Sequence, residues 1–94
     1  MRTRATLTMD GHAPLTGKTT DIGANGCSIC VLDPVLLGQM GQIAFDFMVD
    51  GKIVSVDTRV KTMYCIYSSG EFKAGLQFLN LDLPTVTALA RYLK

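Results

Sequence analysis

Two long runs of alternating residues, joined by the pair Asp50-Gly51, constrain the fold of this 94-residue chain more than any other feature. Before the pair, apolar residues occupy every second position from Ile43 to Val49. After it the same period, with two threonines, continues from Val54 to Ile66. A period of two is typical of strands with one buried face, and Asp-Gly is a strong signal for a two-residue hairpin turn. The sequence therefore predicts a long antiparallel hairpin, with Tyr64 and Ile66 on its inner face. At Met63 both faces become apolar, which predicts a bulge or the passage of the strand into a second part of a barrel.

Shorter strand patterns lie on both sides of this hairpin. Apolar residues alternate with threonines from Ala5 to Met9, and β-prone runs extend from Gly17 to Ile22 and from Cys27 to Leu32. Every second residue from Phe72 to Phe78 is apolar or alanine, after a turn that contains Ser69 and Gly70. The breaker-rich segment 33–38 predicts a crossing loop or one 3₁₀ turn.

The last segment changes to a helical period. Asp82 is a suitable N-cap, Pro84 fits a first turn, and Val86, Leu89 and Leu93 recur at helical spacing. We therefore predict a mainly β chain, a small six-stranded antiparallel β-barrel with a short C-terminal α-helix on its mouth or flank. Strand alternation alone also allows a small sandwich.

The candidate functional stretch is the turn between the second and third strands, where Asp21, Gly23, Asn25 and Gly26 gather. Glycine and asparagine tolerate positive φ, and glycine lets a backbone approach a ligand or another strand closely. The carboxylate of Asp21 can accept hydrogen bonds from turn amides or from the N–H groups of a ligand. An ordinary structural turn would use the same residues, so spacing alone leaves both interpretations open.

The segment Asp21-Ile22-Gly23-Ala24-Asn25-Gly26 resembles the Asp/Asn-x-Ser-x-x-Gly motif of the PilZ domain family, with Gly23 in place of serine. Gly75-Leu76-Gln77-Phe78 is similar to the Gly-x-x-Phe that closes the last long strand in that family. The resemblance extends from about Arg4 to Leu93 and implies the barrel predicted above.

The resemblance also implies a function. PilZ domains are bacterial receptors for cyclic di-GMP that control exopolysaccharide synthesis, motility or type IV pili. In the family an Arg-x-x-x-Arg segment before the first strand clamps the dinucleotide, and the aspartate and serine of the second motif bind guanine. Here Arg2 and Arg4 are only two positions apart. The implied ligand-binding residues are Arg2, Arg4, Asp21, Gly23, Asn25 and Gly26.

Two explanations of the departures compete. Either an arginine segment precedes this piece of a larger chain, or the chain is a degenerate PilZ-like module that contacts a protein effector without the nucleotide. Weak, micromolar binding of cyclic di-GMP is expected in the first case, because Gly23 lacks the serine hydroxyl and the N-terminal lead must be ordered.

Composition limits the remaining function classes. Nine basic and eight acidic residues give a net charge of +1, and aromatic residues make up 7% of the chain without tryptophan. Neither property is typical of a protein that binds long nucleic acid. No apolar run reaches the length of a membrane span, so we expect a single cytoplasmic domain over residues 1–94.

An enzyme or a metal site is not predicted. The only histidine, His12, has no serine and aspartate pattern around it, and the glycines form no P-loop. Cys27 and Cys30 have Cys-x-x-Cys spacing, but residues three apart in a strand point to opposite faces. With Cys65 they are interpreted as small buried hydrophobic residues, and no cofactor is expected.

Overall fold

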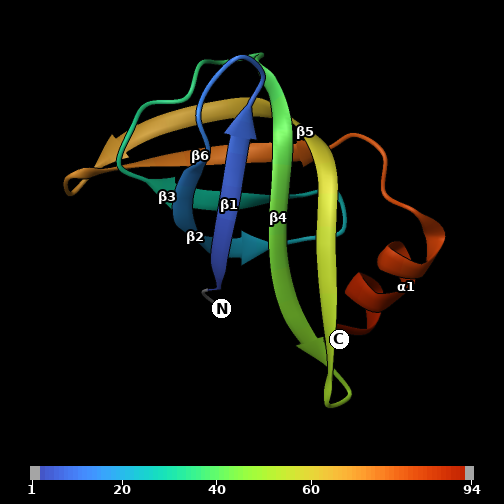
Figure 1. Ribbon diagram of the computed structural model, residues 1–94. Coiled ribbons are helices and arrows are strands. Elements are labelled where there is room, and N and C mark those ends of the chain that lie inside the picture. Colours follow the sequence, from blue (N-terminus) through green and yellow to red (C-terminus); the bar gives the residue numbers. More distant parts are fainter. Residues whose placement is uncertain (1–2, 93–94) are drawn as a thin grey trace.

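The computed structural model describes residues 3–92, which form six strands and one helix (Figure 1). The elements are β1 (Arg4–Met9), β2 (Leu15–Ile22), β3 (Gly26–Val31), β4 (Met40–Val49), β5 (Lys52–Ser68), β6 (Glu71–Phe78) and α1 (Leu83–Tyr92). The strands close into a barrel in the order β1-β2-β3-β6-β5-β4, and every neighbouring pair is antiparallel. The predicted barrel with a C-terminal helix is confirmed, and the closed sheet rules out the sandwich.

Two tight turns use left-handed backbone conformations. Asp50 and Gly51, between β4 and β5, have φ values of 53° and 74°. Ser69 and Gly70, between β5 and β6, have φ values of 53° and 82°. Positive φ at both central residues defines a type I′ turn, whose twist matches that of the flanking strands. The prediction of a hairpin at Asp50-Gly51 is therefore confirmed.

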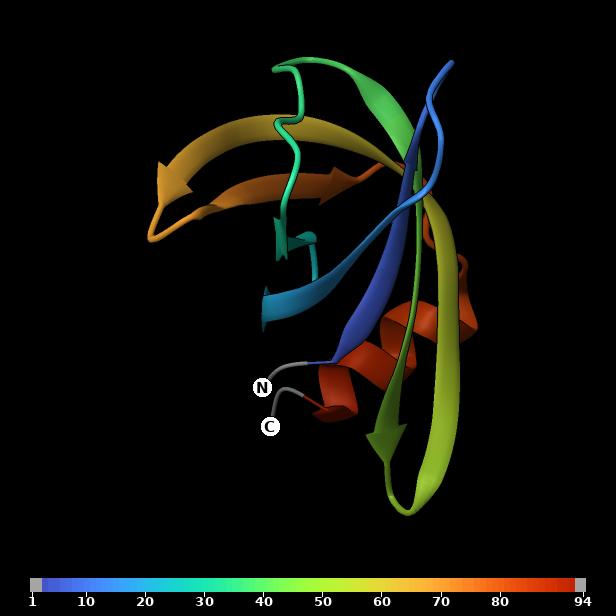
Figure 2. The same ribbon diagram turned by 60° about the vertical axis from the view of Figure 1, so that its left-hand side comes forward.

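The core is made by the inward residues of all six strands together with one residue of the helix and one residue, Val35, of the loop between β3 and β4. The largest fully buried apolar side chains are Leu7, Ile29, Ile43, Val56, Val60 and Leu89. Leu89 belongs to α1, which packs beside β4 and β5 (Figures 1 and 2).

Both ends of α1 have polar contacts. At its start, the backbone N–H of Thr85 donates to the Asp82 carboxylate over 3.3 Å, as predicted for an N-cap. Near its end, Arg91 forms an ion pair with Asp50 at the tip of the β4–β5 hairpin. Leu93, also assigned to the apolar face of the helix, lies outside the described residues. No helix within residues 3–92 is long and apolar enough to cross a membrane.

The strand β5 contains a bulge at Met63, one of the two predicted alternatives, and this bulge corrects the predicted face of Tyr64 and Ile66. Its pairing with β6 shifts register between Thr62 and Tyr64. Because one extra residue reverses the alternation of faces, Tyr64 and Ile66 lie on the outer surface instead of the inner face. Cys65 instead packs against the core.

The segment 32–39 is a loop that crosses from β3 to β4, as expected, and contains no helical turn. Val35 anchors it, since this side chain is buried in the core while the next two residues, Leu36 and Leu37, are exposed. The loop therefore closes one end of the barrel without forming a further regular element.

Candidate functional site

The turn between β2 and β3 is closed by its own backbone. The N–H of Gly23 donates to the carbonyl oxygen of Gly26 over 2.8 Å. Within residues 3–92 the glycines with positive φ are Gly11, Gly38, Gly51 and Gly70, so the tolerance of Gly23, Asn25 and Gly26 for positive φ is not used in this turn.

Glycine has a different role in this turn, which is close approach between strands. A Cβ atom added to Gly26 would lie 2.1 Å from the carbonyl oxygen of Leu76 on β6. Such a contact is with backbone, so no side-chain rotation could relieve it. Gly23 is different, because its added Cβ would lie 3.7 Å from the nearest atom, an ordinary contact. Gly26 is thus required by the fold, whereas Gly23 could be serine.

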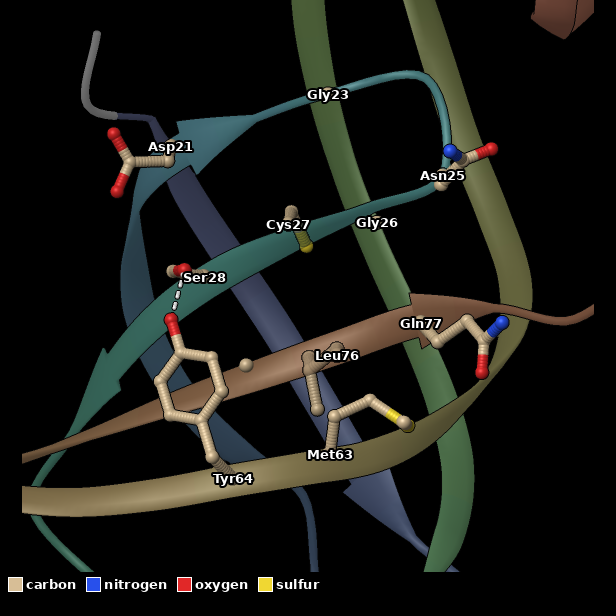
Figure 3. Close-up of a pocket in the computed structure, with 11 residues that line it drawn as sticks. Asp21, Gly23, Asn25, Gly26, Cys27, Ser28, Met63, Tyr64, Leu76 and Gln77 are labelled. Atoms are coloured by element: carbon tan, nitrogen blue, oxygen red, sulfur yellow. Dashed lines mark hydrogen bonds between the residues drawn. The ribbon is translucent and has the colours of Figure 1, made fainter.

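A shallow hollow of about 310 Å³ lies on the outer surface of the barrel beside this turn (Figure 3). Its lining residues come from the turn and from β2, β3, β5 and β6 and include four of the predicted ligand-binding residues, Asp21, Gly23, Asn25 and Gly26. Figure 3 shows Asp21 and Asn25 at opposite ends of the turn, with Cys27 and Leu76 between the turn and β5. The turn and its hollow therefore form one site.

Tyr64 forms the wall opposite the turn. Its hydroxyl lies 2.9 Å from the hydroxyl of Ser28, so the two groups share a hydrogen bond (Figure 3). The ring lies over Gly75, where an added Cβ would come within 2.0 Å of a ring carbon. Met63 and Tyr64 both line the hollow because the bulge turns consecutive residues to the outer surface. An aromatic face held in this way can stack on a planar ring.

Asp21 is the only carboxylate that lines this hollow within the described part of the chain. Its side chain is 75% exposed and lies 3.4 Å from the ammonium group of Lys73 on β6. An exposed pair at this distance contributes little to stability, so both groups are free to exchange this partner for a ligand.

Arg4 lines a second hollow, of about 280 Å³, and is absent from the lining of the first. Lys18 pairs with Arg4 across β1 and β2, and Lys18 also pairs with Cys30 on β3. Ser28 and Cys30 are two residues apart on the same strand face, so the two hollows are neighbours along β3. Arg2, the remaining predicted site residue, lies outside the described residues.

The sequence analysis did not identify Tyr64, Ser28, Lys18 and Lys73 as members of the site. Only the apolar residues on both faces at Met63 pointed to the bulge that exposes Tyr64. Lys73 lies far from Asp21 in sequence, and only the barrel order brings the two together. Lys18 is on the same strand as Asp21 and meets Arg4 through the pairing of β1 with β2.

The three cysteines are free thiols. Cys27 points into the core, and burial raises its pKa to about 12. The description as buried hydrophobic residues fits Cys27, whereas Cys30 and Cys65 are only partly buried. Among the described residues, no group of three or more His, Cys, Asp or Glu side chains could hold a metal ion.

The profile of the PilZ domain family matches residues 1–94. The chain belongs to the PilZ domain family. The resemblance drawn from the two short motifs is therefore confirmed over the whole sequence, although Gly23 replaces the serine of the Asp/Asn-x-Ser-x-x-Gly motif. Comparison with curated proteins gave no significant match.

A solved structure with the same architecture is that of the Bacillus subtilis inhibitor of motility (MotI/DgrA). It is similar to this PilZ domain with a TM-score of 0.84 over 98% of the chain, at 12% sequence identity. This PilZ domain covers 45% of that chain, less than half of its length. At 12% identity this likeness concerns the fold alone.

Proposed function

We propose that this PilZ domain is a cytoplasmic module that binds cyclic di-GMP and thereby regulates a bacterial process such as motility or exopolysaccharide synthesis. Membership of the family supports the ligand class. The name of the structural neighbour, an inhibitor of motility, favours motility among the regulated processes. The observation that carries the proposal is the hollow shared by Asp21, the turn and Tyr64.

The chemistry of this hollow suits a guanine base. Guanine presents two neighbouring N–H donors on one edge, and the exposed carboxylate of Asp21 can accept from both. The ring of Tyr64 offers a flat surface for the base, and the turn places backbone close to it. A volume of about 310 Å³ suits one base and not a whole dinucleotide, so the rest of the ligand would extend over the neighbouring hollow.

That neighbouring hollow carries the positive charge that two phosphates need. Arg4 and Lys18 line it together with one carboxylate, Glu71. Lys73 pairs with Cys30, which also lines this hollow, and forms the ion pair with Asp21. These three cations partly replace the four-residue arginine spacing that the chain does not contain. A guanidinium binds phosphate in a bidentate manner, whereas an ammonium group acts as a point charge. We therefore expect binding in the micromolar range, about −8 kcal/mol.

Titration calorimetry with cyclic di-GMP tests the proposal. Asp21→Ala should weaken binding while leaving the melting temperature within a few degrees of the wild type, because Asp21 is exposed and weakly paired. Asp46→Ala is the matched control, since it removes the same charge from an exposed position on β4. Binding should also fall in Arg4→Ala and should strengthen in Gly23→Ser, which restores the family hydroxyl where the structure has room for it.

The competing hypothesis, a module that contacts a protein effector without the nucleotide, predicts a different result. No heat would then be detected with the wild type, and neither Gly23→Ser nor an added Arg-x-x-x-Arg segment would produce any. A large loss of stability in Asp21→Ala would instead make this residue a structural part of the turn, since lost turn bonds typically cost about 1 kcal/mol.

A further inference from the structure

The end of β5 beyond its bulge, Met63–Ser68, has a strand partner on one side only. β6 pairs with it as far as Ser68 and Glu71, whereas the pairing with β4 stops at Met40 and Lys61. On that second side, no other strand within residues 3–92 pairs with this segment. The β5–β6 hairpin extends away from the body of the barrel (Figures 1 and 2). On the β4 side, Gly38 and Gln39 of the crossing loop bond to the backbone of Thr62, just before this segment begins.

The side chains of this free edge are apolar and exposed. Met63, Ile66 and Tyr67 are 54%, 55% and 65% exposed, and Tyr64 is partly exposed. The six residues of the segment contain no charge, no proline and no glycine. In monomeric proteins, charged residues or proline normally protect a strand edge that faces water. Without them an open apolar edge is a template for another strand.

The other hairpin of the barrel makes the contrast clear. The β4–β5 tip also extends beyond its neighbouring strands, because β1 pairs with β4 only from Gly41 to Phe45. Its outer positions carry Asp46, Asp50, Lys52 and Asp57, and α1 packs beside it. The fold therefore protects one hairpin with charges and a helix and leaves the other uncovered.

The free edge also has a definite hydrogen-bonding register. In a two-residue hairpin the residues that flank the turn, here Ser68 and Glu71, exchange backbone hydrogen bonds with each other. Because hydrogen-bonded positions alternate along an antiparallel pair, the N–H and C=O groups of Tyr67 and Cys65 point away from β6. Two such residues, two positions apart, can bond to one further strand.

We propose that this edge pairs with the same segment of a second copy of the chain. In an antiparallel arrangement with the two-fold axis at Ile66, Cys65 of each copy lies opposite Tyr67 of the other. All outward backbone groups of both residues are then paired. The two Ile66 side chains face each other at the centre, in a non-hydrogen-bonded pair where side chains come closest.

Charge favours a second copy as the occupant. The segment itself is uncharged, so like charges do not meet when it pairs with itself. Lys61 and Glu71, the nearest charged residues in sequence, lie beyond the two ends of the segment, so in this antiparallel register neither charge lies opposite its own copy.

Sedimentation equilibrium over a range of protein concentrations tests the proposal. The wild type should show a reversible dimer, and Ile66→Lys should abolish it by placing two ammonium groups against each other. Ile53→Lys is the matched control, because Ile53 lies on the same strand, is 70% exposed and lies at the protected tip. This control should dimerise like the wild type. Circular dichroism shows that each variant is folded.

A second measurement fixes the register. Ile66→Cys, in a background whose three native cysteines are replaced by alanine, should oxidise to a covalent dimer, whereas Ile53→Cys in the same background should not. A wild type that stays monomeric at every concentration overturns the proposal and leaves the edge to a strand of another protein. So does a dimer that survives Ile66→Lys, or equal cross-linking at both positions.

Discussion

Replacing Gly26 by alanine should destabilise the barrel strongly, whereas the same change three residues earlier, at Gly23, should not. The added Cβ at position 26 would lie 2.1 Å from the carbonyl oxygen of Leu76, and Cβ atoms essentially never approach other atoms within 3.0 Å. The β3 and β6 backbones would therefore have to separate by roughly 1 Å, which strains or lengthens the ladder between Gly26 and Gln77.

The size of the effect follows from three contributions. Overpacking in a close contact typically costs about 1–3 kcal/mol, and a weakened backbone hydrogen bond costs about 1 kcal/mol more. Replacing glycine by alanine restricts the unfolded chain and returns about 0.4–1 kcal/mol. The net loss should be about 1–3.6 kcal/mol. That corresponds to a fall of roughly 5–30 °C in melting temperature for a domain of this size.

Urea unfolding followed by circular dichroism measures both variants directly. Gly26→Ala should lower the midpoint, and Gly23→Ala should leave it unchanged or raise it slightly, because its Cβ would have an ordinary contact at 3.7 Å and no positive φ. A domain of this length has a total stability of about 5–10 kcal/mol, so Gly26→Ala should remain folded without denaturant. Equal midpoints for the two variants would refute the close approach of β3 and β6.

Three further predictions use the same protein. Thiol titration near pH 8 should leave Cys27 unreacted in the native state, because burial raises its pKa to about 12, and should count three thiols after denaturation. Tyr64→Phe should lower the free energy of unfolding by about 1 kcal/mol, since the buried hydroxyl of Ser28 loses its partner. Hydrogen bonds from Arg59 hold the pKa of Asp10 below its usual value of 3.8, so their stabilisation is present above that pH and is lost on acidification. Asp10→Asn should therefore show a weaker decline in stability than the wild type between about pH 4 and pH 2.

The parts of the fold that follow from local chemistry could be predicted from the sequence. The alternation around Asp50-Gly51 specified a hairpin, because few turns other than type I′ suit two adjacent residues of this kind. Asp82 and Pro84 marked the start of the helix for similarly local reasons. In these cases the residues that decide the structure are adjacent in the chain.

The site could be predicted only in part, because contacts between distant strands form most of it. Asp21 and Gly26 were found from a short motif, but the reason for Gly26 lies on β6, in the carbonyl oxygen of Leu76. Tyr64 was placed on the same face as Val60, because the alternation was continued to Ile66 across the bulge that the residues at Met63 indicated. Lys73 meets Asp21 only because β6 lies next to β3 in the barrel.

The bulge at Met63 also means that the place of the extra residue decides which side chains of β5 face outward. Along β5, odd-numbered residues such as Asp57 and Arg59 face outward before the bulge, and even-numbered residues such as Tyr64 and Ile66 face outward after it. Deleting Met63 would make the pairing with β6 regular, because the inward Thr62 would be followed directly by Tyr64 opposite Gly75. Tyr64 and Ile66 would then still face outward, so the wall of the hollow and the apolar edge would both survive the loss of this residue.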